Sequence, residues 1–216
     1  RGFIKMKEMS LIQIARACRG TYVGREDRKN QEVSGVVIDS RLAAPGYLFA
    51  AVKGARVDGH SFIPTVFAKG AAAVLCEQLP EHPAGPCILV DSTLEAIKRL
   101  AEYYRSTLTI PVVGISGSVG KTSTKEMIAS ILSQRYQVLK TEGNFNNEIG
   151  LPLTIFRIRE EHEAAVLEMG ISDFGEMTRL ARMARPTICV LTNIGLCHLE
   201  NLKDRDGILK AKTEMF

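Results

Sequence analysis

A glycine-rich segment, Gly114-Ile-Ser-Gly-Ser-Val-Gly-Lys-Thr122, constrains the fold of this chain more than any other feature. It begins within an apolar run at residues 112–115, which is typical of a buried strand, and it precedes apolar residues at helical spacing. Glycines at such a junction let backbone N–H groups turn around phosphate oxygens, and the helix N-terminus adds positive partial charge. The segment therefore predicts a phosphate-binding loop between a parallel strand and a helix.

Each residue type in this loop suits ATP. Lys121 is a candidate catalytic residue because its ammonium can reach the outer phosphates, and the hydroxyl of Thr122 can bind Mg²⁺. The spacing departs from the usual pattern because Ile115 stands where the first glycine would lie. An incidental glycine-rich turn is the alternative, and the strand-to-helix context disfavours it. The predicted phosphate-binding residues are Gly117, Ser118, Val119, Gly120, Lys121, Thr122 and Ser123.

Composition indicates a folded globular protein. The chain has 216 residues, 45% hydrophobic and 24% charged, which excludes wholesale disorder and coiled coil and allows one or two domains. Lys plus Arg (28) minus Asp plus Glu (24) gives +4, too small a charge to indicate a nucleic-acid partner. The sequence shows neither a membrane-helix run nor a signal-peptide core, so we expect no membrane association and a cytoplasmic location. The 5 cysteines lack C-x-x-C spacing, and we expect them to be reduced core residues.

Alternating strand and helix patterns predict an α/β protein. We expect a small N-terminal α/β domain at residues 1–110 and a P-loop domain with a mostly parallel sheet at residues 111–216. The second domain is expected to be truncated, because its last helix has no stop signal. The predicted strands are residues 33–38, 71–76, 87–90, 112–115, 136–139, 164–168 and 187–191. The predicted helices are residues 62–69, a capped helix from Ser92 that ends before Pro111, the region of 127–132, and a segment from about Asp206.

Several motifs together resemble the Mur ligases. The loop Gly117-Ser-Val-Gly-Lys-Thr-Ser-Thr-Lys-Glu126 is similar to the ATP-binding loop of that family, in particular of its MurF type. The resemblance covers nearly the whole chain. The other matching stretches of the second half are Asn144-Phe-Asn-Asn-Glu-Ile-Gly-Leu-Pro-Leu-Thr154, Leu167-Glu-Met-Gly170, Asn193-Ile-Gly-Leu-Cys-His198 and Ala211-Lys-Thr-Glu-Met-Phe216. In the first half they are Ile38-Asp-Ser-Arg41, Pro45-Gly-Tyr-Leu-Phe49 and Asp58-Gly-His60.

The resemblance implies an ATP-dependent amide ligase of peptidoglycan precursor synthesis, using ATP and Mg²⁺. Such a monomeric enzyme adds D-alanyl-D-alanine to UDP-N-acetylmuramoyl-tripeptide through an acyl phosphate. The related MurE type typically has Thr-Asn where this loop has Ser118-Val119. Two other hypotheses stay open: a binding fragment without turnover, and another P-loop enzyme such as a kinase or a folylpolyglutamate-type ligase. The Asp-Ser-Arg41 and Asp-Gly-His60 segments argue against the last.

Two departures from the family pattern stand out. The chain reads Leu199-Glu-Asn-Leu-Lys-Asp-Arg-Asp-Gly207 where many relatives have a turn containing Gly-Ser, so the role of this loop stays open. The family also continues beyond Phe216 with the rest of the middle domain and a third domain. We expect those parts to supply the adenine contacts and much of the dipeptide site.

The predicted metal ligands are Thr122, Glu168 and His198. Glu168 ends an apolar strand, where doubly wound folds place ligand contacts, although an ordinary surface acid is the alternative. His198 is implied by the resemblance, and histidine is an unusual ligand for Mg²⁺. Lys212 aligns with a lysine that this family carbamylates, so it is a second candidate catalytic residue, with a solvated helix lysine as the alternative.

The predicted substrate contacts lie in both halves. Asn146 and Asn147 can donate and accept amide hydrogen bonds, but asparagine-rich turns also form for backbone reasons. The resemblance implies uridine or diphosphate contacts in the first half, where turn formation is the competing explanation. Those candidates are Ser40, Arg41, Asp58 and His60.

Overall fold

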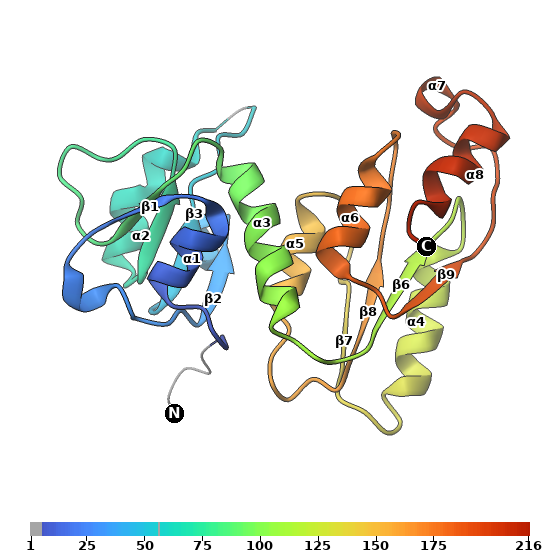
Figure 1. Cartoon of the computed structure of the whole chain (residues 1–216), viewed down its shortest axis with the longest axis horizontal. Helices are drawn as coiled ribbons and strands as arrows, with labels where there is room; N and C mark the ends of the chain where they lie inside the picture. The colour runs from blue at the N-terminus through green and yellow to red at the C-terminus, as the bar shows by residue number, and fades with distance from the viewer. Residues whose placement is uncertain (1–5, 56) are drawn as a thin grey trace. The chain divides into compact units, whose positions relative to one another are not determined.

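A computed structural model describes residues 6–55 and 57–216, and the chain forms two compact units that meet between Thr107 and Leu108 in the sequence (Figure 1). Both units are α/β, and the sheet of unit 2 is parallel, as predicted from the sequence. In unit 1, for which no strand direction was predicted, all but one strand pairing is parallel. In the described ranges, every helix is too short or too polar to cross a membrane.

Unit 1 is built on a five-stranded sheet of order β1-β5-β4-β3-β2, in which only β1 is antiparallel to its neighbour. Its strands are β1 (Thr21–Val23), β2 (Gly35–Val37), β3 (Tyr47–Ala50), β4 (Ala73–Cys76) and β5 (Cys87–Leu89). Its helices are α1 (Leu11–Cys18), α2 (Ile63–Ala68) and α3 (Thr93–Ser106), with 3-10 turns η1 (Glu26–Arg28), η2 (Ser40–Leu42) and η3 (Gly59–Phe62). The sequence patterns had predicted neither β1, β3 nor α1.

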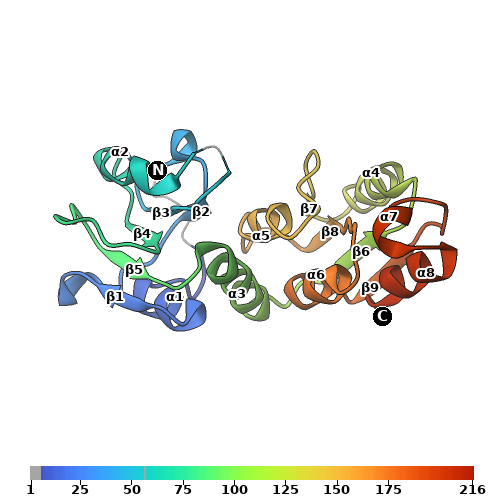
Figure 2. The ribbon, with the colours of Figure 1, turned by 90° about the horizontal axis from the view of Figure 1, so that it is seen from above.

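Helices cover both faces of this sheet. Figure 2 shows α2 on one side and α1 and α3 on the other. Phe49 and Val74 pack with Ile63 of α2 in one apolar cluster. Side chains alternate along a strand, so the residues that precede and follow Phe49 in β3 and Val74 in β4 are directed to the opposite face, toward α1 and α3. The cysteines are free, as predicted, but only Cys18, Cys76 and Cys87 are buried, whereas Cys189 and Cys197 are partly exposed.

Helix α3 begins after the predicted cap residue Ser92 and buries an apolar stripe. The Ser92 Oγ accepts a hydrogen bond from the Glu95 N–H at 3.4 Å, but the Glu95 carboxylate accepts from Lys98 Nζ at 2.8 Å instead of returning to Ser92. The second capping contact comes from Glu77, whose Oε1 accepts from the N–H and hydroxyl of Thr93 at 2.8 and 2.9 Å. A residue distant in sequence therefore completes the cap.

Leu100 lies in the buried stripe of α3 and is 0% exposed. We expect Leu100→Ala to lower the free energy of unfolding of unit 1 by about 2–5 kcal/mol, because it removes apolar contacts and leaves a cavity. Amide hydrogen exchange within unit 1 measures the loss. The matched control is Leu42→Ala, which truncates a leucine that is 64% exposed and should cost less than about 0.5 kcal/mol. Equal costs for the two variants would contradict the packing described here.

Unit 2 is a four-stranded, fully parallel sheet of order β7-β8-β6-β9. Its strands are β6 (Val112–Ser116), β7 (Val138–Lys140), β8 (Ala164–Glu168) and β9 (Ile188–Leu191). Its helices are α4 (Lys121–Leu132), α5 (Gly150–Ile155), α6 (Glu176–Ala184), α7 (Leu199–Leu202) and α8 (Arg205–Thr213). Figure 2 shows α4 and α6 on opposite sides of this sheet. The central strands β6 and β8 end side by side, so the loops that follow them meet at one edge.

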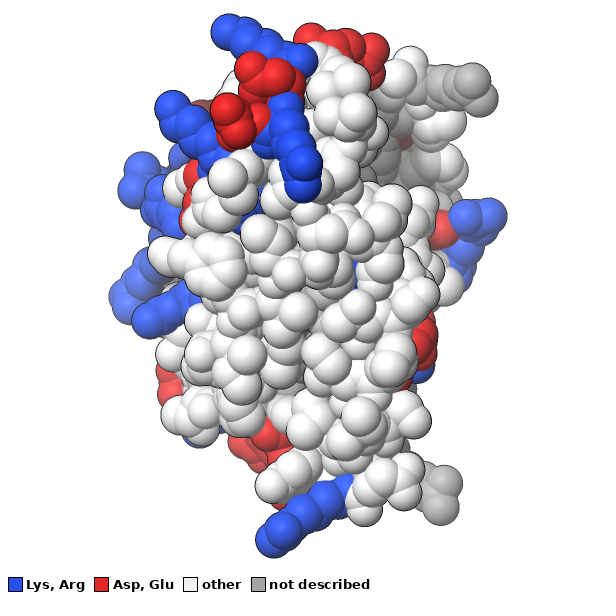
Figure 3. Space-filling view, turned by 90° about the vertical axis from the view of Figure 1, so that its right-hand side faces the viewer, with Lys and Arg blue, Asp and Glu red and all other residues white. Residues whose placement is uncertain are grey.

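One side of the molecule carries a broad area without charged side chains, with charges gathered mainly around its margin (Figure 3). Strand β9 is an edge strand of unit 2, and its Ile188 is 54% exposed. The exposed large apolar side chains of unit 2 include Val119, Met127, Ile131, Ile188, Leu196, Leu199, Leu209 and Phe216.

Candidate functional site

The predicted phosphate loop lies between β6 and α4, with the strand-to-helix geometry that its sequence requires. Gly117 and Gly120 have φ angles of +146° and +81°, which side-chain-bearing residues rarely adopt. Gly120 is the N-cap of α4, so the first helical N–H groups point toward the loop. The Lys121 Nζ donates a hydrogen bond to the Gly117 carbonyl at 2.8 Å, which folds the lysine back over the loop.

The segment that follows β9 holds this loop in place. The Ser118 and Val119 N–H groups donate to the carbonyl and side-chain oxygens of Asn193, both at 3.1 Å. The Thr192 hydroxyl donates to the Val119 carbonyl at 2.7 Å. Asn193 belongs to a motif that matches the Mur ligases, and its role in holding the loop depends on contacts between segments distant in sequence.

Ser118 binds the same segment through its side chain. Its Oγ accepts from the Gly195 N–H at 2.9 Å and donates to the Gly195 carbonyl at 3.2 Å. The Cys197 thiol also donates to this oxygen, at 3.2 Å. The Ser118 hydroxyl therefore joins the phosphate loop to the chain that leads to His198.

Glu168 lies at the end of β8 and is 3% exposed. Its Oε2 accepts from the Thr122 hydroxyl at 2.9 Å, and its Oε1 accepts from the Asn146 amide at 2.8 Å. Its backbone N–H donates to the Thr141 hydroxyl at 3.0 Å. The structure thus brings together three predicted site residues, Thr122, Asn146 and Glu168, and Glu168 is buried instead of being an ordinary surface acid.

The donors in this cluster fit Mg²⁺. The Thr122 hydroxyl and the Glu168 carboxylate are hard oxygen ligands, which Mg²⁺ prefers. His198 is exposed and adopts φ +54°, and its side chain makes no hydrogen bond or ion pair with the described residues. Nowhere in residues 6–55 or 57–216 do three or more His, Cys, Asp or Glu side chains form a metal-binding group.

Lys212 lies on α8 and is 1% exposed, so the alternative of a solvated helix lysine is wrong. Burial lowers the pKa of Lys212, and the nearby positive charge of Lys121 lowers it further, while Cys197 acts in the opposite direction. A buried amine with a lowered pKa is a better nucleophile near neutral pH than an exposed lysine.

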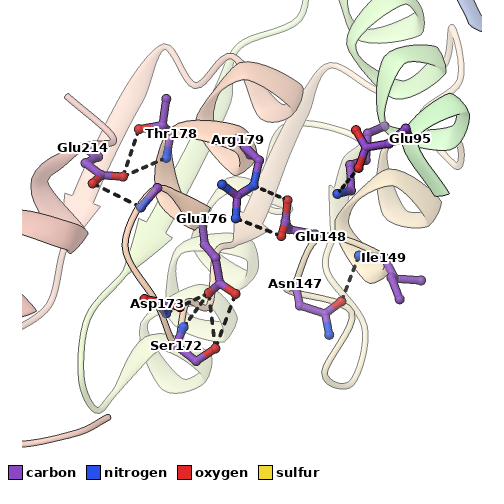
Figure 4. Close-up of polar contacts among 12 residues, drawn as sticks. Glu95, Asn147, Glu148, Ile149, Ser172, Asp173, Glu176, Thr178, Arg179 and Glu214 are labelled. Carbon is purple, nitrogen blue, oxygen red and sulfur yellow. Dashed lines mark hydrogen bonds and ion pairs between the residues drawn. The ribbon is translucent and has the colours of Figure 1, made fainter. Parts of the chain in front are cut away.

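Glu214 fixes the end of the helix that carries Lys212. Its Oε2 accepts from the N–H and the hydroxyl of Thr178 at 3.2 and 2.9 Å, and its Oε1 accepts from the Gly175 N–H at 3.4 Å (Figure 4). Gly175 is the N-cap of α6 and has no capping side chain of its own. A carboxylate from α8 therefore caps α6, which sequence reasoning missed because the partners are far apart in the chain.

Figure 4 also shows how Asn147 and Glu148 are used. The Asn147 Oδ1 accepts from the N–H groups of Ile149 and Gly150 at 3.1 and 2.8 Å, which forms the turn into α5. Glu148 pairs with Arg179 of α6 at 2.5 Å. The alternative of an asparagine turn therefore describes Asn147, whereas Asn146 is turned to Glu168.

In unit 1, Arg41 is available to a ligand and Ser40 is part of a turn. The side chain of Arg41 is 87% exposed, and its Nη2 lies 2.6 Å from Asp39 Oδ2. Hydrogen bonds from the Arg41 side chain and backbone hold the pKa of Asp39 at about 2. The Ser40 carbonyl accepts from Lys69 Nζ at 2.8 Å. An exposed guanidinium on a short turn is suited to an anionic group.

Asp58 and His60 contact each other and help to hold the turn η3 in place. Asp58 Oδ1 lies 2.7 Å from His60 Nδ1 and also accepts from the His60 backbone N–H at 2.9 Å, so the pKa of this carboxyl is lowered. The Glu77 N–H donates to His60 Nε2 at 2.9 Å. Because Nε2 accepts, Nδ1 carries the proton and donates to Asp58. The pair connects η3 to the chain after β4.

Models of known protein families match most of the chain. The model of the "Mur ligase middle domain" matches residues 115–216, and that of the "Mur ligase family, catalytic domain" matches residues 32–105. The chain belongs to the Mur ligase family. The resemblance read from the motifs is therefore confirmed, and the phosphate loop with its Glu168 cluster lies in the middle domain of a Mur ligase.

Curated relatives agree on one member of this family. The chain is 44% identical over 212 residues to the UDP-N-acetylmuramoyl-tripeptide--D-alanyl-D-alanine ligase of Bacillus subtilis, covering 97% of this chain and 46% of that protein. It is 40% identical over 181 residues to the Escherichia coli ligase of the same name, covering 84% and 40%. The chain spans about half the length of the curated relatives it matches, so the expected truncation of the second unit is confirmed.

Solved structures show the same fold. A crystal structure of MurF from Acinetobacter baumannii matches with a TM-score of 0.87 at 34% identity, covering 98% of this chain and 47% of that one. MurF from Thermotoga maritima in complex with ADP matches with a TM-score of 0.76 at 38% identity, covering 84% and 42%.

A substitution at Gly117 tests how closely the phosphate loop packs against the segment after β9. A Cβ at this position would lie 1.9 Å from Thr192 Oγ1. We expect Gly117→Ala to lower the free energy of unfolding of unit 2 by at least about 2 kcal/mol, through overpacking and backbone strain. Chemical denaturation followed by circular dichroism measures the change. The matched control is Gly143→Ala, at φ +52° with nothing within 4 Å, which should cost about 1 kcal/mol. A smaller loss for Gly117→Ala than for the control would contradict the clamp.

Proposed function

We propose that the protein containing this chain is an ATP-dependent ligase that joins D-alanyl-D-alanine to UDP-N-acetylmuramoyl-tripeptide. The names of the similar curated proteins support this assignment. The observation that carries it is the Thr122 hydroxyl at 2.9 Å from the buried Glu168, beside the phosphate loop. The MurE type is less well supported, because a diaminopimelate ligase matches at only 17% identity and a TM-score of 0.58, which shows the fold alone.

The proposed reaction has two steps. A carboxylate oxygen of the tripeptide attacks the γ-phosphorus of ATP, the bond to the bridging oxygen breaks, and ADP leaves with that electron pair. The D-alanyl-D-alanine amine then attacks the acyl carbon, loses a proton, and expels inorganic phosphate. Both partners in the first step are anions, so the protein must neutralise negative charge.

The residues of this chain suit the first step. The α4 N-terminus and the loop N–H groups bind phosphate oxygens, and Lys121 exchanges its 2.8 Å contact with the Gly117 carbonyl for the outer phosphates. Thr122 and Glu168 would hold Mg²⁺, which supplies Lewis-acid stabilisation of the transferring phosphoryl group. In unit 1, Ser40 and Arg41 would contact the uridine-diphosphate end of the substrate, with Asp58 and His60 shaping the neighbouring turn. Asn146 would contact the substrate from the edge of the Glu168 cluster, while Asn147 would support it through the turn.

A binding fragment is the second candidate for the chain as given. Its span of about half the length of the relatives favours this view, because the remaining half is expected to supply adenine and dipeptide contacts. In this state the protein would be a cytoplasmic monomer that binds phosphate without turnover.

Lys121→Ala tests the phosphate loop. In the full-length enzyme we expect turnover to fall at least about 100-fold, because stabilisation of the transferring phosphoryl group is lost. In the 216-residue chain, calorimetric titration with Mg-ATP should show weaker binding than wild type. Lys210→Ala, on the exposed face of α8, is the control and should leave both values unchanged. Unchanged turnover in Lys121→Ala would overturn the assignment.

We also propose that Lys212 is carbamylated. Only a neutral amine attacks carbon dioxide, forming an N–C bond and releasing a proton, so the burial and lowered pKa of Lys212 favour the reaction. The product is an anion, which would relieve the repulsion between Lys212 and Lys121 and could help to hold the metal ions.

Carbon-13 NMR with labelled bicarbonate tests this modification. A carbamate signal should appear in the wild type and grow between about pH 6 and pH 9 at constant dissolved carbon dioxide, since the neutral fraction of the amine rises with pH. The signal should be missing from Lys212→Arg and retained in Lys210→Arg, which alters an exposed lysine of the same helix. A signal that survives in Lys212→Arg would refute the assignment.

A further inference from the structure

A second lysine of α4 is buried beside the Glu168 cluster, and the proposed reaction does not use it. Lys125 is 2% exposed, although lysine is almost never fully buried without a partner. It follows Thr122 by three positions, so both side chains lie on the same face of the helix. That face is directed to β8, whose last residue is Glu168.

Two carboxylates flank the Lys125 ammonium. Its Nζ lies 3.2 Å from Glu126 Oε1 and 3.9 Å from Glu168 Oε2. Glu126 also pairs with Lys140 of β7. Burial and these contacts on both sides fix the position of the Lys125 charge, in contrast to an exposed lysine that can swing into solvent.

Lys125 compensates the charge of Glu168. The Thr122 hydroxyl and the Asn146 amide donate hydrogen bonds to that carboxylate, but both groups are neutral. Within the described part of the chain, Lys125 is the cation that pairs with Glu168. A buried carboxylate without a counter-charge is costly, so the protein supplies internally part of what a divalent cation would supply.

We infer that Lys125 makes binding of a divalent cation at Glu168 depend on bound nucleotide; this inference rests on the proposed function. Without nucleotide, the fixed ammonium neutralises Glu168 and repels an incoming cation. Phosphate groups of a nucleotide add negative charge beside Thr122 and reverse that balance. Lys125 thereby acts through Glu168 and sets the order of ligand binding, without touching the reacting atoms.

Binding of Mn²⁺ to the 216-residue chain, followed by electron paramagnetic resonance without nucleotide, tests the inference. We expect weak binding by the wild type and at least a tenfold lower dissociation constant for Lys125→Met, because one positive charge near the cation is removed. Lys125→Arg keeps the charge and should match the wild type. Lys140→Met is the matched control, because it breaks only the outer pair with Glu126. Equal Mn²⁺ affinity in Lys125→Met and wild type would overturn the inference.

Further variants separate the effect from misfolding. The double variant Lys125→Met, Glu168→Gln removes both charges, so it should fold and lose the gain in Mn²⁺ affinity; a gain that persists would refute the role of Glu168. If Lys125→Met is unfolded without metal, Mn²⁺ should restore its circular dichroism spectrum, and failure to do so while Lys125→Arg folds would count against the inference.

Measuring Mn²⁺ binding in the presence of ADP distinguishes this inference from the proposed function. The wild type should bind Mn²⁺ more tightly when ADP is present, and Glu168→Gln should not. Absence of any ADP effect in the wild type would overturn both ideas. A clear ADP effect together with unchanged metal-only affinity in Lys125→Met would overturn the Lys125 inference alone.

Discussion

The buried carboxylate of Glu168 organises unit 2. It lies at the end of a central strand of a parallel sheet, where charge is costly unless partners surround it. The partners of the carboxylate come from different elements: Thr122 and Lys125 from α4, and Asn146 from the loop before α5. The backbone N–H of Glu168 donates to Thr141, which follows β7. The hydrogen bonds that the Glu168 carboxylate accepts therefore hold the helix that follows the phosphate loop in position against the neighbouring loop.

The phosphate loop depends on a second constraint, its contact with the chain after β9. Gly117 leaves no room for a Cβ because Thr192 lies against it, and Asn193 receives hydrogen bonds from two loop N–H groups. In the same segment, the Cys197 thiol donates a hydrogen bond to Ser118 of the loop, and His198 follows directly. Phosphate binding to the Val119 N–H would compete with Asn193, so ligand binding and the position of this segment are physically linked.

Short sequence patterns predict much of the fold, whereas the remaining features depend on contacts between residues distant in the sequence. The phosphate loop, the parallel strands of unit 2 and the stripe of α3 follow from short patterns, so the sequence was sufficient for them. Strands β1 and β3 are only a few residues long and carry too little periodicity to stand out. The burial of Lys125 and the cap that Glu214 gives to α6 arise from contacts between distant segments, which no local pattern encodes. Amide chemistry suggested substrate contacts for Asn146 and Asn147 alike, whereas in the structure Asn147 forms a turn and Asn146 donates to Glu168.

Charge balance connects these features to an anionic ligand. Lys121 and Lys125 each place an ammonium group near the end of the sheet, where Glu168 is the buried acid. Glu126 is shared with Lys140 at the surface and so compensates this excess only in part. A site left positive in this way gains more from a polyphosphate than from a neutral ligand, because the phosphates supply the missing counter-charge.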